Sequence, residues 1–222
     1  MTGMRTGGMA RVAFLGVVVV VVVAGCGAPE VPGPAPTPSV VWSAGEPAGD
    51  LELDPWVRAV RAGALSTAVA LNARDTRSES LHATWTPAAI RKMNSNLNKW
   101  SRERNEDGAV RVAGPRPFDP VSVEVAADGR SATVSGCTVE DWTIGRDDRS
   151  FDDGHEPVMG WYEVVLTEDG RYLLDGSSYS DTRCESDNLT VGTFDPLPDG
   201  DWEYWQEDIL KGGFAEDPSE AP

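Results

Sequence analysis

Residues 121–134 read VSVEVAADGRSATV, and this stretch decides the fold. Its first arm alternates valine with polar or small residues, which is the period of a strand with one buried face. Asp128-Gly129 then interrupts the alternation, and this dipeptide is typical of a tight β-turn. The sequence therefore predicts an antiparallel hairpin whose returning strand is Ser131–Cys137. The valines predicted to share its buried face are Val121, Val123 and Val125.

A second hairpin is predicted further along the chain. Residues 158–166 are rich in β-branched and aromatic side chains, Glu168-Asp169-Gly170 supplies a turn, and residues 171–175 return. The returning strand is expected to bend at Gly176 and to continue over Ser177–Cys184.

Two amphipathic helices are predicted ahead of the hairpins. Asp54-Pro55 and Thr86-Pro87 each place a capping side chain before a proline, which favours the start of a helix. Apolar residues then recur at three- and four-residue spacing. These stripes are Trp56, Val60, Ala64, Ala68 and Leu71 in the first helix, and Ile90, Met93, Leu97 and Trp100 in the second. Helices followed by antiparallel hairpins indicate an α+β fold with the helices on one face of the sheet.

The N-terminus has the pattern of a secretory signal peptide over residues 1–25. A basic start precedes an apolar run over residues 12–23, and small residues follow. Val23-Ala24-Gly25-Cys26 resembles the lipobox of bacterial lipoproteins, in which the cysteine is diacylated and begins the mature chain. The resemblance implies lipidation at Cys26 and attachment to the extracytoplasmic face of the cell membrane. Two alternatives stay open, an uncleaved membrane anchor and an unmodified thiol.

Composition divides the remaining chain into a spacer, a domain and a tail. Residues 26–50 are rich in Pro, Gly and Ala, which favours an extended polyproline II spacer behind the lipidated cysteine. Residues 51–195 form the α+β domain, which is long enough to bury a core. Residues 196–222 form an acidic tail with a short amphipathic helix. Its apolar stripe is expected either to dock on its own domain or to bind a partner, and consists of Trp202, Trp205 and Ile209.

The order and size of these elements resemble the cone-shaped fold of nuclear transport factor two and the SnoaL-like proteins. The resemblance rests on the two long helical segments, Gly114-Pro115 at the start of the sheet, and hairpins rich in Trp and Tyr. Secreted actinobacterial lipoproteins include many such domains. The resemblance implies a curved antiparallel sheet that encloses a pocket together with the helices. Members of the family use this pocket for catalysis, for small-molecule binding or for assembly.

Two cysteines remain once Cys26 is assigned to lipid. Cys137 and Cys184 are an even number in an oxidising compartment, which predicts a disulfide between them. The alternative is a redox or nucleophilic cysteine. The sequence offers neither a Cys-x-x-Cys motif nor a basic neighbourhood that would lower a thiol pKa.

Charge excludes several classes of function. The chain carries 19 basic and 36 acidic side chains, a net charge of −17. This balance disfavours binding to nucleic acid and electrostatic docking on anionic lipid. The sequence lacks the motifs of zinc proteases, serine hydrolases and phosphate-binding loops. No catalytic residue, no metal site and no cofactor is therefore predicted.

Three groups of residues nevertheless have a chemical alternative. The acidic stretch 146–156 is expected either to be a solvated loop or to hold Ca²⁺. His82 is expected to be an ordinary half-buried side chain rather than a residue of the pocket. If the pocket were catalytic, its acid or base would come from Asp175, Asp181 or Glu163.

Eight tryptophans are many for a chain of this size. Trp56 and Trp100 lie on the predicted helical stripes and are expected in the core. Trp142 and Trp161 flank the acidic stretch, where they are expected either to fill the core or to stack on the sugar rings of a cell-wall glycan.

The leading hypothesis is a non-catalytic, membrane-anchored surface lipoprotein that serves as an interaction or accessory subunit of a cell-envelope complex. The lipobox-like site, the spacer and the amphipathic tail favour it. One alternative is a protein that binds a small apolar ligand or a cell-wall sugar in the pocket of the cone. The other is a SnoaL-like enzyme.

Overall fold

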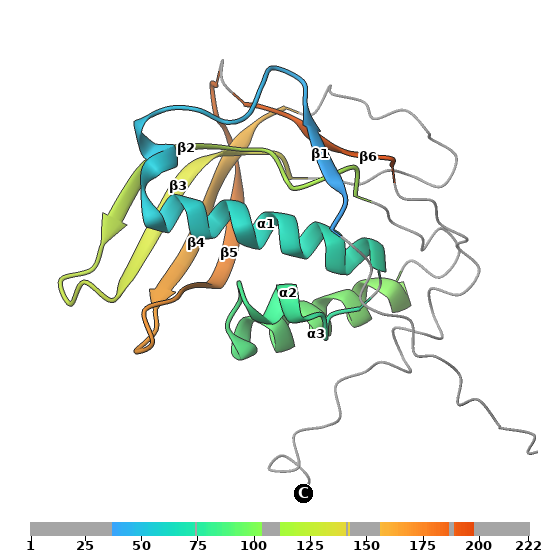
Figure 1. Cartoon of the computed structure of the whole chain (residues 1–222), viewed down its shortest axis with the longest axis horizontal. Coiled ribbons are helices and arrows are strands. Elements are labelled where there is room, and N and C mark those ends of the chain that lie inside the picture. Colours follow the sequence, from blue (N-terminus) through green and yellow to red (C-terminus); the bar gives the residue numbers. More distant parts are fainter. Residues whose placement is uncertain are drawn as a thin grey trace, which may run out of the picture. The chain divides into compact units, whose positions relative to one another are not determined.

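The computed structural model describes residues 37–73, 75–103, 112–140, 142, 156–186 and 189–197. The helical elements are a 3₁₀-helix at Asp50–Leu53, α1 (Pro55–Ala73), α2 (Glu79–His82) and α3 (Pro87–Glu103). The strands are β1 (Ser39–Trp42), β2 (Phe118–Val125), β3 (Ser131–Thr138), β4 (Val158–Leu166), β5 (Tyr172–Arg183) and β6 (Gly192–Asp195). The predicted α+β class is confirmed, with one four-stranded and one two-stranded antiparallel sheet (Figure 1).

Two hairpins build the four-stranded sheet, whose strand order is β2-β3-β4-β5. At the first turn Gly129 has a φ of 68°, and the Ala126 N–H donates to the Ser131 carbonyl at 2.8 Å. At the second turn the Thr167 N–H donates to the Arg171 carbonyl at 2.8 Å. Both turns lie where the sequence predicts them, because a tight turn depends on the residues within it.

A β-bulge in β2 corrects the predicted buried face of the first hairpin. Pro120 pairs with Gly136 and Ser122 with Ser135, so Val121 has no partner in this register. Val121 is 57% exposed and Val125, at the end of the strand, is 50% exposed, whereas Val123 packs on the core. The extra residue shifts the alternation. Phe118 and Val123 therefore reach the same core, which strict alternation would forbid.

A second irregularity lies at the predicted bend of the last strand. Glu163 pairs with Gly176 and Val164 with Leu174, which makes Asp175 the extra residue of a bulge in β5. The strand continues beyond this point to Arg183, as predicted.

Both long helices begin at the predicted caps. The Asp54 carboxylate accepts the Trp56 N–H at 2.8 Å, and the Thr86 hydroxyl accepts the Ala89 N–H at 3.2 Å. Each cap satisfies a backbone donor that the first turn of a helix leaves without an intrahelical partner. None of the helices in the described ranges is both long enough and apolar enough to cross a membrane.

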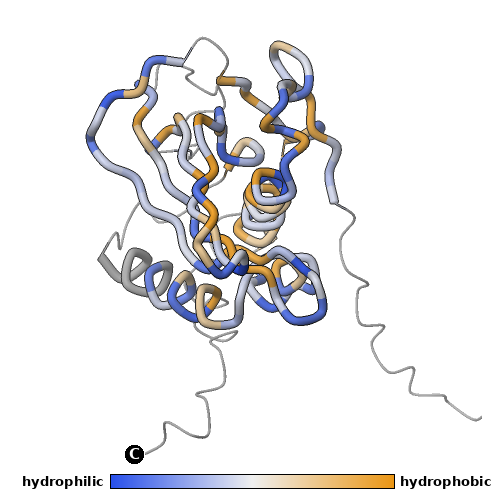
Figure 2. The backbone as a smooth tube through the Cα atoms, turned by 90° about the vertical axis from the view of Figure 1, so that its left-hand side faces the viewer, coloured by the Kyte–Doolittle hydropathy of each residue, from blue (hydrophilic) through white to orange (hydrophobic). Residues whose placement is uncertain are grey.

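The helices pack on one face of the four-stranded sheet. α1 runs across the strands and contacts all four of them, while α3 contacts β5 (Figure 1). Figure 2 shows hydrophobic residues, in orange, on helices and strands where these elements lie next to one another. The largest fully buried side chains of this core include Val57, Val60, Leu81, Ile90, Phe118, Val134, Val164 and Leu174.

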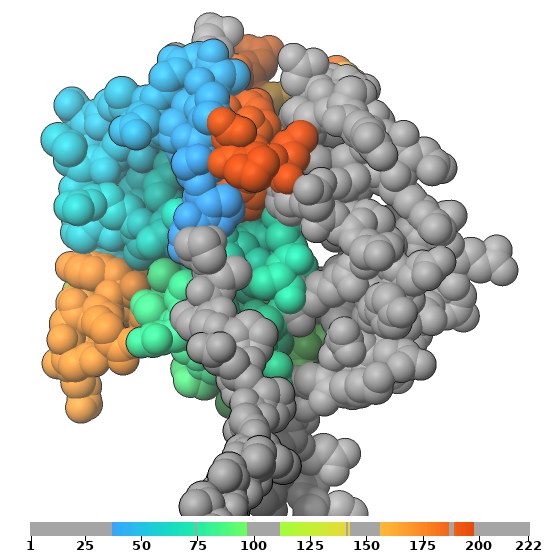
Figure 3. Space-filling view, turned by 45° about the vertical axis from the view of Figure 1, so that its right-hand side comes forward, coloured from blue at the N-terminus to red at the C-terminus, as the bar shows by residue number. Residues whose placement is uncertain are grey.

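The two-stranded sheet joins residues that are distant in the sequence. β1 pairs with β6, with Ser39 opposite Asp195 and Trp42 opposite Gly192. The two strands lie side by side in Figure 3, β1 in blue and β6 in red. The spacer predicted for residues 26–50 therefore does not extend over residues 39–42. This segment forms a strand because Val40, Val41 and Trp42 favour one, despite the prolines around them.

Candidate functional site

A cavity of about 960 Å³ lies between α1, α3 and the four-stranded sheet. Residues 175–179 of β5 all border it, although successive side chains of a strand point to opposite faces. The cavity therefore reaches past the face of the sheet to the edge of β5. Its apolar lining includes Ala64, Ala68, Leu71, Trp85, Met93 and Val158.

Three of the described tryptophans lie in different places, namely the core, the cavity wall and the far face of the sheet. Trp56 lies in the core, where its ring meets that of Tyr172 edge-on at 4.7 Å between centroids. Trp142 is buried in the cavity wall, and its indole N–H donates to the Gly114 carbonyl at 2.8 Å. Trp161 is half-buried, alternates with the inward-facing Tyr162 and does not line the cavity. The structure therefore does not bring Trp142 and Trp161 together as one sugar-stacking surface.

Tyr162 and Thr138 are buried polar side chains of the cavity wall. Tyr162 is 6% exposed and meets the Phe118 ring edge-on at 5.0 Å. Burial raises the pKa of its hydroxyl, and this effect exceeds the opposing effects of the Arg116 charge and of a hydrogen bond with Thr138. Thr138 itself donates to the Pro117 carbonyl at 2.8 Å. The cavity wall thus holds a neutral tyrosine hydroxyl near a guanidinium group.

The charged residues of the lining differ in depth. Arg116 is half-buried, and its Nη1 donates to the carbonyl oxygens of Val139 at 2.7 Å and Glu140 at 2.9 Å. Its Cζ lies 5.6 Å from the centroid of the Tyr179 ring. The other charged lining residues are exposed and form the rim, namely Lys92, Glu140, Glu156, Asp175, Asp181 and Arg183.

The candidate acids and bases lie at the rim or outside the cavity. Asp175 and Asp181 line the cavity but are exposed, and Asp175 accepts a hydrogen bond from the Thr86 hydroxyl at 2.5 Å. Glu163 is exposed and does not line it. His82 was predicted to be half-buried, which is wrong, because it is the exposed last residue of the short helix α2. None of these groups is enclosed with the apolar lining.

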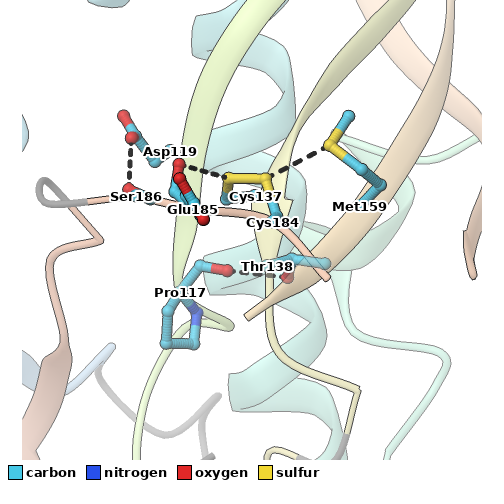
Figure 4. The surroundings of a disulfide bond; sticks show 8 residues. All are labelled: Pro117, Asp119, Cys137, Thr138, Met159, Cys184, Glu185 and Ser186. Carbon is cyan, nitrogen blue, oxygen red and sulfur yellow. Dashed lines mark hydrogen bonds between the residues drawn. A yellow bond between two sulfur atoms is a disulfide. The ribbon is translucent and has the colours of Figure 1, made fainter. Parts of the chain in front are cut away.

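Cys137 and Cys184 form a disulfide, with their Cα atoms 5.5 Å apart. After β5 the chain crosses the face of the sheet that is turned away from the helices (Figure 4). Met159 Sδ of β4 lies 3.2 Å from Cys184 Sγ, and the Ser186 hydroxyl donates to the Asp119 carboxylate of β2 at 2.5 Å. Residues 184–186 therefore form a strap that ties β5 to β3 and β2.

Several predicted site residues lie outside the described residues. These are the lipidation site Cys26, the tail residues Trp202, Trp205 and Ile209, the histidine His155, and most of the acidic stretch 146–156. Its last residue is described, and Glu156 forms an ion pair with Arg183 at 2.6 Å. Within the described ranges, no three His, Cys, Asp or Glu side chains converge as a metal site would require.

Sequence reasoning did not find Arg116, Thr138 or Tyr162 as residues of one site. Each lies in a different segment, and only the pairing of β3 with β4 and the path of residues 112–117 bring them together. The one local signal was Gly114-Pro115 immediately before Arg116. The chain matches no known protein family, and no curated protein and no solved structure is significantly similar to it.

Proposed function

We propose that this chain is a lipid-anchored extracytoplasmic protein that binds a small molecule in the cavity between its helices and its sheet. The cavity is the observation that carries the proposal. Its volume of about 960 Å³ lies at the upper end of the range typical of ligand sites, roughly 300–1,000 Å³. An apolar lining with a few polar groups at defined positions is also typical of such sites.

The arrangement of the elements supports a cone-shaped domain of the kind that the sequence resembles. Helices cover one face of a bulged antiparallel sheet, and bulges increase the twist and bend of the strands that carry them. A sheet bent around its helices leaves room that side chains do not fill. The cone thus remains a proposal for the architecture, with the cavity as its interior.

The proposed role is binding rather than catalysis. A general acid or base must lie within hydrogen-bond distance of the substrate atom that it serves. Asp175 and Asp181 are exposed at the rim, and Asp175 already accepts a bond from Thr86. This placement favours a role in closing the mouth of the cavity over a role in proton transfer.

The binding proposal is tested with a cavity-filling variant. Ala64 lines the cavity from α1, so Ala64→Phe should reduce binding of the neutral apolar dye Nile red to the full chain. Ala73, the exposed last residue of the same helix, is outside the lining, so Ala73→Phe is the matched control. Equal binding by both variants, or no binding by the unaltered chain, would contradict a ligand cavity. Native mass spectrometry of the same preparation would reveal a ligand retained from the cell.

The anchor is tested separately. Cys26→Ala removes the only thiol of the lipobox-like site, so the protein should move from the membrane fraction to the medium. Labelling with radioactive palmitate should be lost at the same time. Membrane association that survives the substitution would favour the uncleaved anchor.

A second candidate function is that of an accessory subunit of an envelope complex. It is favoured by the exposed apolar side chains of Val121 and Val125 on β2, an edge strand of the described sheet. Cross-linking in intact cells should then capture one membrane assembly. Deletion of residues 199–213 should weaken the capture if the tail takes part, and unchanged capture would exclude the tail from the contact.

A further inference from the structure

The position of one positive charge indicates which ligands the cavity selects. Every other charged residue of the lining is exposed at the rim, whereas Arg116 is half-buried beside Tyr162 and Thr138. A charge withdrawn from water destabilises a protein unless a partner compensates for it. The partners of Arg116 therefore decide whether it is a structural residue or a ligand-binding one.

The described contacts of Arg116 compensate for its charge only in part. Its Nη1 binds two backbone carbonyls, at 2.7 and 2.9 Å, and both are neutral groups. Within the described ranges no carboxylate forms an ion pair with it, in contrast to Arg61 and Arg183. These two hydrogen bonds occupy one of its three nitrogens. A guanidinium group presents five N–H donors in a planar fork, so Nε and Nη2 can still bind an acceptor in the cavity.

The surroundings also hold the guanidinium group in place. The two carbonyls fix it from the end of β3, and the Tyr179 ring lies 5.6 Å from Cζ. A donor that is held in advance loses less conformational entropy when it binds an acceptor. The Tyr162 hydroxyl adds a polar group on the same wall.

We propose that the ligand is an anionic amphiphile, a molecule with an apolar body and a carboxylate, whose carboxylate binds Arg116. This inference rests on the proposed binding function and specifies its ligand class. The apolar body lies against the lining that α1 and α3 supply, which includes Ala64, Leu71 and Met93. Planar guanidinium groups bind carboxylates through two parallel hydrogen bonds, which matches the two nitrogens that remain.

The acidic rim is consistent with this assignment. Glu140, Asp175 and Asp181 repel an anion that stays at the mouth, but exposed charges are screened over about 8 Å at physiological salt. A carboxylate that reaches Arg116 has left the rim behind. An anion without an apolar body gains nothing from the lining, so the cavity selects amphiphiles over small anions.

The test compares an acid with its methyl ester, which keeps the same apolar body but has no charged carboxylate. The full chain carrying Cys26→Ala, so that no acyl chain of its own competes, is titrated with 11-(dansylamino)undecanoic acid and with the methyl ester of the same molecule. The acid should bind at least about tenfold more tightly, because a hydrogen bond to a charged group contributes that much. Equal affinity, or a preference for the ester, overturns this inference and leaves the cavity proposal intact. Failure of both probes to bind overturns the binding function itself.

Variants locate the preference. Arg116→Met should weaken binding of the acid about tenfold or more while the ester stays within about twofold. The ester is the internal control, because damage to the cavity would weaken binding of both probes. If Arg116→Met loses both, the affinity ratio of acid to ester in the unaltered chain decides whether the inference holds. Arg171→Met removes an exposed, ion-paired charge outside the lining and should change the affinity for the acid by no more than about twofold. A larger loss from Arg183→Met, which removes an exposed rim charge, than from Arg116→Met would place the carboxylate at the rim and overturn the inference.

Discussion

The two sheets of this molecule are held together in different ways. In the four-stranded sheet, tight turns connect β2 to β3 and β4 to β5, and the helices cover one face. In the two-stranded sheet, Ser39 pairs with Asp195 across 156 positions of sequence. Closing so long a loop costs entropy that local contacts do not offset. The smaller sheet therefore depends on the larger one, which brings its two strands together.

Two buried phenylalanines give the largest expected effects and test this dependence. Phe118 starts β2 and is 1% exposed, and Phe194 lies in β6 and is 2% exposed. Phe118→Ala should lower the free energy of global unfolding by about 3–5 kcal/mol, because it leaves a void in the main core. Phe194→Ala removes a comparable side chain from a separate buried cluster, where Phe194 packs with Ala68, Val112 and Trp142. It should instead open the β1–β6 pair locally, so that amide exchange of residues 39–42 rises about a hundredfold.

Hydrogen exchange followed by mass spectrometry distinguishes the two cases. The amides of β3 and β4 should keep their protection in the Phe194 variant and lose it in the Phe118 variant. If both variants release all strands together, the two sheets form one cooperative unit and the proposed dependence is wrong.

The disulfide gives the next largest effect. It links cysteines 47 positions apart, and disulfides that close loops of this size typically contribute about 2–4 kcal/mol to stability. Replacing both Cys137 and Cys184 by Ala should lower the free energy of unfolding by that amount in urea titrations. The strap leads from β5 toward β6, so the same variant should also increase exchange at residues 192–195.

Met159 offers the control for the strap. Met159→Leu preserves the volume beside Cys184 and should change stability by less than about 1.5 kcal/mol. If the cysteine double variant is no less stable than Met159→Leu, packing and not the covalent bond accounts for the stabilising effect of the strap.

The same contrast explains how far the sequence predicts the fold. The turns at Asp128-Gly129 and at 168–170 and the caps Asp54 and Thr86 are local signals, and the structure confirms all of them. The bulge at Val121 was missed because only the register with β3 defines it. β1 was missed because its four residues need a partner strand that lies at the other end of the domain.

The candidate site, like the bulge and β1, depends on residues that are far apart in the sequence. The sequence predicts a pocket only through a family resemblance, and Arg116 had no motif to mark it. Its significance depends on the carbonyls of Val139 and Glu140 and on the Tyr179 ring, which two other segments of the chain supply. A lone arginine among 19 basic residues becomes a candidate only when its burial is known.

Two glycines in open turns provide a matched pair of smaller effects. Gly129 has a φ of 68° in the turn between β2 and β3, and Gly45 has a φ of 89° shortly after β1. A Cβ atom at either position meets nothing within 4 Å, so alanine costs only the left-handed backbone, about 1–2 kcal/mol. Gly129→Ala should lower the melting temperature of the whole domain. Gly45→Ala should increase amide exchange at residues 39–42 and leave the melting temperature nearly unchanged. An equal drop in melting temperature for the two variants would contradict the idea that the two-stranded sheet opens independently of the four-stranded one.

The smallest effect concerns Tyr162 and alkaline pH. Burial raises the pKa of its hydroxyl above the value of about 10 that a tyrosine has in the unfolded chain. The folded state thus binds this proton more tightly, and its contribution to stability is complete below pH 10 and is lost as the pH rises through the folded pKa. Tyr162→Phe should therefore show a shallower fall in the free energy of unfolding between pH 9 and pH 11 than the unaltered chain. Tyr179→Phe, at a 48% exposed position of the neighbouring strand, is the matched control and should keep the steeper slope, because it leaves Tyr162 in place. Identical slopes for both variants would mean that the hydroxyl of Tyr162 is open to water, and the neutral polar group of the cavity wall would be lost from the ligand site.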